Sequence, residues 1–192
     1  MKISVFNTPI LNALLRAMAI GGLRLSGWKI TPPARLDPPY VVIGAPHTSN
    51  WDFLLMLAAI FISRMDVKWM GKNSLFPPVL GSVMRWLGGI PIDRDRSQDV
   101  VLQMAREFRE NETLTLVIAP EGTRKKVSQW KSGFYYIAFK AKVPIMMTVI
   151  DAGLKEVRFA GTFMPTGNYQ QDLPKILEHY SHARGIVPKN QP

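Results

Sequence analysis

Apolar residues follow two alternating patterns along this chain. Short apolar runs rich in Val, Ile and Leu are typical of buried strands, and longer stretches with helical periodicity are typical of amphipathic helices. The short runs predict strands at residues 27–30, 40–45, 67–72, 90–93, 113–120, 144–150 and 156–161. The periodic stretches predict helices at residues 52–64, 75–88, 97–111, 133–142 and 172–184.

This alternation determines the predicted fold class. Parallel strands need a crossover connection, which is usually a helix. The chain therefore predicts a single α/β domain, with a central largely parallel or mixed sheet and helices on both faces. Ligands of such sheets bind in loops at the carboxyl ends of strands, so residues directly after a strand are the first candidates for a functional site.

The N-terminal segment (1–26) predicts a further helix ahead of the first strand. Ile10, Leu14 and Met18 recur every four residues, and all charged residues in the segment are basic. Two interpretations are equally open: a helix packed on the core, or a helix in the membrane interface with basic side chains near lipid phosphates. We therefore divide the chain into an N-terminal amphipathic helix (1–26) and a main domain (27–192).

Charge and composition limit the kinds of binding partner that we expect. The chain has 24 Lys and Arg against 14 Asp and Glu, a net charge of +10. This balance favours a polyanion: nucleic acid, an anionic membrane or a phosphorylated small molecule. The absence of cysteine excludes disulfides and thiolate nucleophiles and fits a reducing compartment. No uncharged run exceeds 14 residues, fewer than the roughly 20 that a spanning helix needs.

The stretch "APHTSNWDF" contains the first candidate chemistry. His47, one of only three histidines, directly follows a predicted strand, and Asp52 lies in the first turn of the next helix. If His47 lies just outside that helix, Asp52 can reach back to one ring nitrogen and leave the other as a general base for a substrate hydroxyl. The alternative is a capping box, with Ser49 as the cap and Asp52 at the third helical position.

The second candidate site is the stretch "PEGTRKK" (120–126), which comes at the end of another predicted strand. Gly122 allows close approach of a ligand to the backbone, Thr123 supplies a hydroxyl and Arg124 a planar fork suited to phosphate. The stretch "GGIPIDRDR" (88–96) is similar: two glycines are followed by a short predicted strand and then by Arg94. The alternative for each stretch is an ordinary exit from a strand, followed by solvated charges.

The sequence motifs of several other kinds of functional site are absent. The chain contains no G-x-S-x-G nucleophile elbow and no G-x-G-x-x-G or P-loop sequence. His179 and His182 lie far from His47 in the sequence and are interpreted as solvated helix residues rather than metal ligands.

Four blocks in order resemble those of the glycerolipid acyltransferases, the lysophosphatidic acid acyltransferase-like (1-acylglycerol-3-phosphate O-acyltransferase) family, in its short bacterial form. The blocks are "HTSNWD" (47–52), "GGIPIDR" (88–94), "PEGTR" (120–124) and "VPI" (143–145). Two departures bear on acyl or acceptor preference: Pro91 stands where the family often has an aromatic residue, and Met146 and Met147 follow the fourth block instead of a second proline.

The resemblance implies a role for each block. His47 would be the general base and Asp52 would orient it, while residues 27–192 would form the acyltransferase domain. The residues implied in binding the acceptor's phosphate are Arg94, Glu121, Gly122, Thr123 and Arg124. The resemblance implies no metal and no cofactor, and acyl-CoA or acyl-carrier protein as the donor.

It also implies a lysophospholipid acceptor. Because the long spanning segments of some relatives are missing, we expect a peripheral enzyme on the cytoplasmic face of the cell membrane. The basic residues follow the four blocks, so we expect no nucleic acid as a partner. The identity of the acceptor lipid, which includes lyso-aminolipids, stays open, as do acyl chain length, donor and oligomeric state. The alternative from a different class is a basic, non-catalytic module that binds membranes or nucleic acid.

Overall fold

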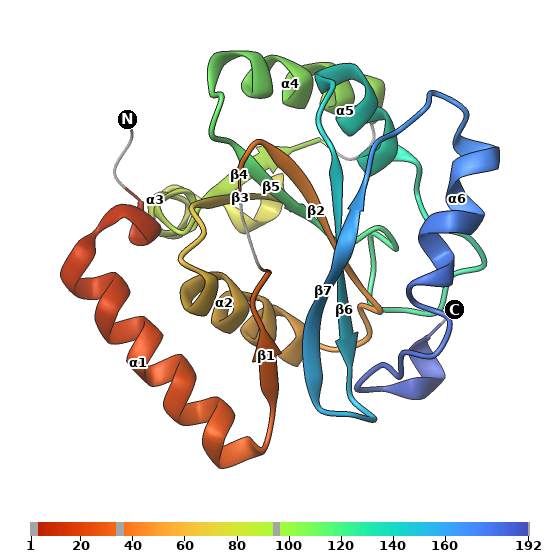
Figure 1. Ribbon diagram of the computed structural model, residues 1–192. Coiled ribbons are helices and arrows are strands. Elements are labelled where there is room, and N and C mark those ends of the chain that lie inside the picture. Colours follow the sequence, from red (N-terminus) through yellow and green to blue (C-terminus); the bar gives the residue numbers. More distant parts are fainter. Residues whose placement is uncertain (1–3, 34–36, 94–96, 192) are drawn as a thin grey trace.

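The computed structural model describes residues 4–33, 37–93 and 97–191, and it confirms the predicted α/β class. In this part of the chain seven strands form one sheet in the order β1-β7-β6-β2-β5-β3-β4 (Figure 1). The strands are β1 (Lys29–Thr31), β2 (Tyr40–Ala45), β3 (Val67–Lys72), β4 (Gly89–Ile92), β5 (Thr115–Ile118), β6 (Ile145–Asp151) and β7 (Glu156–Phe163). The helices are α1 (Pro9–Ser26), α2 (Trp51–Ser63), α3 (Leu80–Trp86), α4 (Ser97–Glu110), α5 (Gly133–Ala141) and α6 (Tyr169–Glu178), and 3-10 turns lie at Val5–Asn7, Asn73–Leu75 and Pro188–Asn190.

The centre of the sheet is parallel. The neighbouring strands β6, β2, β5, β3 and β4 all run in the same direction. β7 follows β6 through a short turn and therefore pairs antiparallel with it, and the edge strand β1 pairs in parallel with β7. A parallel sheet centre is buried on both faces, so helices must cover each side.

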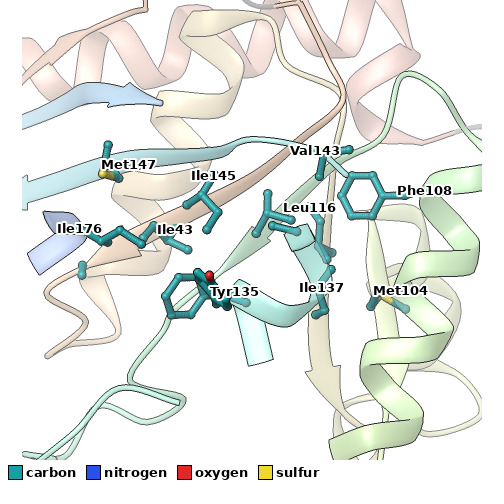
Figure 2. Close-up of a cluster of buried hydrophobic side chains, with 14 of the residues drawn as sticks. Ile43, Met104, Phe108, Leu116, Tyr135, Ile137, Val143, Ile145, Met147 and Ile176 are labelled. Atoms are coloured by element: carbon teal, nitrogen blue, oxygen red, sulfur yellow. The ribbon is translucent and has the colours of Figure 1, made fainter. Parts of the chain in front are cut away.

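The strand β2 contributes side chains to a hydrophobic core on each face of the sheet. Ile43 and its neighbours two residues away, Val41 and Ala45, lie in a core that includes side chains of α4, α5 and α6 (Figure 2). Val42, between them, packs in a second core together with Ile60 and other residues of α2. A shift by one residue would exchange these two sets, so the register of β2, and with it the position of the loop that follows, is strongly fixed.

The helix α1 packs on the core by one stripe and exposes another. Leu11 and Leu23 join the cores beneath it. Ile10, Leu14 and Met18, the predicted apolar stripe, are 88%, 57% and 63% exposed. The two interpretations of this helix are therefore compatible with each other. No helix within the described ranges is both long and apolar enough to cross a membrane.

The last helix begins and ends earlier than the predicted 172–184. α6 begins at Tyr169, where the Asn168 side chain accepts the Gln171 N–H, and it ends at Glu178. Tyr180 and Ala183 are also buried, so the apolar pattern continues past the end of the helix. The backbone there, however, is no longer helical. Residues 179–191 instead return to the carboxyl end of β2.

Candidate active site

The loops after β2 and β5 lie side by side because these strands are parallel neighbours, with Ile43 opposite Ile118. The first loop contains His47, and the second begins with the sequence Ala-Pro-Glu-Gly. The backbone N–H of His47 donates to Oε1 of Glu121 at 2.9 Å and so links the two loops. The strand order thus brings two motifs that are distant in sequence into one site.

Asp52 reaches back from the first turn of α2 to His47, as the spacing predicts. Its Oδ2 lies 3.1 Å from Nδ1 of His47. The Asp52 side chain is 2% exposed, whereas that of His47 is 25% exposed. Nε2 of His47 forms no hydrogen bond with any residue in the described ranges. Neutral His47 with its proton on Nδ1 therefore has a free lone pair on Nε2.

The same carboxylate oxygen also caps α2. Oδ2 of Asp52 accepts the backbone N–H groups of Thr48 at 2.6 Å and Ser49 at 2.7 Å. Capping and orientation of the histidine therefore occur together and are not alternatives. The predicted cap residue is wrong in detail: Asn50 precedes the helix, and the hydroxyl of Ser49 accepts the N–H of Trp51.

Glu121 is buried next to this pair. It is 2% exposed, and its Oε2 has no hydrogen-bond partner among the described residues. Burial raises the pKa of Glu121; backbone hydrogen bonds and the charge of His47 oppose this effect, and the charge of Asp52 adds to it. The contact with the His47 backbone gives Glu121 a structural role that the sequence pattern did not predict.

The predicted phosphate-binding residues Gly122, Thr123 and Arg124 continue the second loop. Gly122 has φ +66°, in the left-handed region that favours glycine, and an added Cβ would lie 2.9 Å from Cδ of Lys131. Arg124 is exposed. Sequence reasoning missed Lys131, which comes close because the loop folds back and the Lys131 N–H donates to the carbonyl of Pro120 at 2.9 Å.

Arg94 lies outside the described residues. The strand before it, β4, runs parallel to β3 and β5 and ends at Ile92. The carboxyl end of β4 is therefore at the same edge of the sheet as the two loops described above.

A pocket of about 400 Å³ opens beside the two loops, lined in part by Glu121, Trp130, Tyr180 and Gln191. The rings of Trp130 and Tyr180 pack edge to face with centroids 5.1 Å apart, and the Tyr180 hydroxyl donates to the Ile43 carbonyl at 3.3 Å. Burial raises the pKa of Tyr180 well above its ordinary value of 10.0, so its hydroxyl stays a donor. No short motif connects these residues, so the pocket could not be predicted from sequence patterns.

This arrangement places a histidine, oriented by a buried carboxylate, beside a loop with basic side chains. A carboxylate on Nδ1 stabilises the imidazolium that forms when Nε2 takes a proton. In the described ranges, no three or more His, Asp or Glu side chains are placed to hold a metal ion.

Comparisons with known proteins agree with the sequence blocks. The family model described as Acyltransferase matches residues 29–151, more than half of the chain. The human 1-acyl-sn-glycerol-3-phosphate acyltransferase beta is 32% identical over 141 residues, which are 68% of this chain and 48% of that protein. The 1-acyl-sn-glycerol-3-phosphate acyltransferase of Limnanthes alba is 25% identical over 126 residues, 58% of this chain and 45% of that protein. The chain thus spans about half the length of these relatives.

A solved structure is similar in fold. The 1-acyl-sn-glycerophosphate (LPA) acyltransferase PlsC from Thermotoga maritima superposes with a TM-score of 0.60 at 19% identity, covering 88% of this chain and 75% of that chain. The matched region 29–151 contains all four sequence blocks, including the linked His47, Asp52 and Glu121. The chain therefore belongs to the acyltransferase family that includes the 1-acyl-sn-glycerol-3-phosphate acyltransferases.

Proposed function

We propose that this protein transfers a fatty acyl group from acyl-CoA or acyl-carrier protein to the free hydroxyl of a lysophospholipid. The favoured acceptor is 1-acylglycerol-3-phosphate, which gives phosphatidic acid. The observation that carries this proposal is the contact between His47 and Asp52, in which a buried carboxylate holds one ring nitrogen and leaves the other free. The names of the relatives support the class of acceptor.

The proposed reaction is direct acyl transfer. Nε2 of His47 takes the proton of the acceptor hydroxyl as its oxygen attacks the thioester carbonyl. The carbon–sulfur bond then breaks, and the proton passes from Nε2 to the leaving thiolate, which departs as a free thiol. Proton transfer of this kind contributes about a hundred- to ten-thousandfold to the rate. No covalent acyl-enzyme, metal or cofactor takes part in this scheme; the acyl thioester is a co-substrate.

The basic loop after β5 is the proposed site for the acceptor's phosphate. Arg124 is exposed next to a glycine with positive φ, and Lys131 packs against that glycine. A lysine ammonium group and a planar guanidinium suit phosphate oxygens. Thr123 and Arg94 complete the proposed set. Glu121, near the start of this loop, links it to the loop that contains His47.

The exposed stripe of α1 is the proposed membrane contact. Ile10, Leu14 and Met18 lie on a helix with basic charges only, the composition of an interfacial helix on an anionic membrane. We place the protein on the cytoplasmic face of the cell membrane as a peripheral protein. The substrates of the proposed reaction, a lysolipid and an acyl thioester, meet at such a surface.

The direct test is thiol release from palmitoyl-CoA by the purified protein, with and without 1-acylglycerol-3-phosphate. Release that depends on the acceptor, and that His47→Ala abolishes while the circular dichroism spectrum is unchanged, would support the proposal. Normal turnover in His47→Ala would eliminate His47 as the base. If palmitoyl-CoA gives no release, palmitoyl-carrier protein and lyso-aminolipids are assayed next, and failure of every pair would favour a non-catalytic binding module.

The membrane contact has its own test. Leu14→Ser with Met18→Ser should lower binding to vesicles containing anionic phospholipid, because both side chains are exposed and can be changed without opening the core. Ser82→Ala, an exposed change on α3, is the matched control. Equal vesicle sedimentation of the double variant and the control would contradict a membrane role for α1.

A further inference from the structure

The residue after the candidate base is held by a distant part of the chain. Thr48 is 2% exposed although it lies in a loop. Its hydroxyl oxygen accepts the backbone N–H of Val187 at 3.1 Å, and its carbonyl accepts the side-chain amide of Asn190 at 3.1 Å. Its own N–H donates to Asp52 at 2.6 Å. Thr48 is thus fixed on one side by the partner of His47 and on the other by the end of the chain.

The segment that holds Thr48, which we call the C-terminal brace (residues 183–191), is itself fixed. The side-chain amide of Gln191 donates to the Ala183 carbonyl at 2.6 Å, and its oxygen accepts the Gly185 N–H at 2.9 Å. The Arg184 carbonyl accepts the Ala152 N–H at 2.7 Å, which attaches the brace to the turn between β6 and β7. In Figure 1 the brace, in dark blue, lies at the end of the sheet where β6 ends. It is therefore a closed, anchored loop.

The brace also packs tightly against Thr48. A Cβ added at Gly185 would lie 2.5 Å from Cγ2 and 2.8 Å from Oγ1 of Thr48. Real Cβ atoms do not approach other atoms so closely, so any side chain at this position must displace Thr48 or the brace. Gly185 is buried, and only a hydrogen atom fits between its backbone and the side chain of Thr48.

From these contacts we infer that the C-terminal brace is a positioning element for His47, with Thr48 as the residue through which it acts. This inference rests on the proposed acyl transfer. The brace lies outside the matched region 29–151. A displacement of about 1 Å in a reacting group can cost about a hundredfold in rate. Release of Thr48 should therefore lower kcat while KM stays near its original value, because no brace residue is assigned to the substrate phosphate.

Asn190→Ala is the first variant, and Lys189→Ala, a change at an exposed residue of the same 3-10 turn, is the control. We expect Asn190→Ala to lower kcat about tenfold, with KM within about twofold. It should also speed amide hydrogen exchange at Thr48 and Ser49, whose N–H groups donate to Asp52. Unchanged kcat and unchanged exchange, or equal effects of Lys189→Ala, would overturn the inference.

A second pair of variants separates positioning from general stability. Gly185→Ala should lower kcat by about ten- to a hundredfold, because the new methyl group displaces Thr48. Thr48→Ser removes Cγ2, the closest of the overlapping atoms, and keeps the hydroxyl that accepts the Val187 N–H. Because Oγ1 still lies 2.8 Å from the added Cβ, combining Thr48→Ser with Gly185→Ala should restore part of kcat. A double variant no better than Gly185→Ala would refute the role of this contact.

The exchange measurement needs no substrate. Absence of acyl transfer by the unmodified protein would therefore count against the proposed function, whereas normal exchange at Thr48 and Ser49 in Asn190→Ala would count against the brace.

Discussion

Asp52→Asn tests the candidate site most directly, because one oxygen atom of Asp52 accepts three hydrogen bonds. Oδ2 accepts from Nδ1 of His47 and from the backbone N–H groups of Thr48 and Ser49. The two backbone N–H groups can only donate, so they require the amide oxygen of asparagine at the position of Oδ2. The amide nitrogen must then replace Oδ1, which is buried without a hydrogen-bond partner in the described ranges. The substitution therefore keeps the histidine tautomer and removes the charge.

The magnitudes follow from this geometry. Hydrogen bonds to charged groups are worth about 1.5–3 kcal/mol and neutral ones about 0.5–1.5, so three weakened bonds lower the free energy of unfolding by about 3 kcal/mol. The attraction between a carboxylate and an imidazolium 3.1 Å apart is about 5 kcal/mol at an effective dielectric constant of about 20, and it is lost in the transition state. Turnover should therefore fall at least about a hundredfold.

Urea unfolding followed by tryptophan fluorescence measures the first quantity, and acceptor-dependent thiol release measures the second. His47→Ala is the comparison: it should abolish turnover but cost less stability, because its ring is partly exposed and makes a single hydrogen bond to Asp52. Turnover of Asp52→Asn within about threefold of the original protein would refute the orienting role. A loss of stability below about 0.5 kcal/mol would refute the hydrogen-bond geometry.

Three further predictions concern other contacts. Burial raises the pKa of Glu121 above its ordinary 4.5, so its contribution to the free energy of unfolding falls as the pH rises from 4.5 through the raised value; Glu121→Gln should remove this part of the pH profile of urea midpoints, and an unchanged profile would contradict it. The hydroxyl of Tyr135 donates to the buried Asp172 at 2.6 Å, so Tyr135→Phe should lower the free energy of unfolding by about 1.5–3 kcal/mol in urea, and no change would show the bond to be unimportant. Gly122→Ala should raise the KM for the acceptor several-fold, because the new methyl group meets Lys131 and the φ is strained, whereas an unchanged acceptor KM would remove this loop from the phosphate site.

The parts of the fold that the sequence predicted correctly depend on local patterns. The continuous apolar run of β2 and the five-residue spacing of His47 and Asp52 are each contained within one segment, and the structure matches both. The limits of α6 were wrong because buried residues after Glu178 continue the periodicity without a helix, and because the cap at Asn168 was not recognised.

The contacts that the sequence did not predict join segments far apart in the chain. Glu121 meets the His47 backbone only because β5 is inserted next to β2, and apolar periodicity does not determine the order of strands in a sheet. No role was predicted for Thr48, because its partners come from the end of the chain. Lys131 lies near Gly122 for a similar reason, the folding back of a long loop.

These distant contacts share a physical cause. The loop after β2 has too few residues to form a core of its own, yet a general base must keep a fixed orientation if its nitrogen is to meet a substrate hydroxyl. The structure fixes this loop from three directions: Asp52 holds the ring of His47, Glu121 holds its backbone, and the brace holds Thr48. Each contact buries a polar group that would be costly to leave unpaired, so loss of one anchor strains the other two. Variants of Asp52, of Glu121 and of the brace, when combined, should therefore have non-additive effects on turnover. Additive effects would mean that the three contacts act independently.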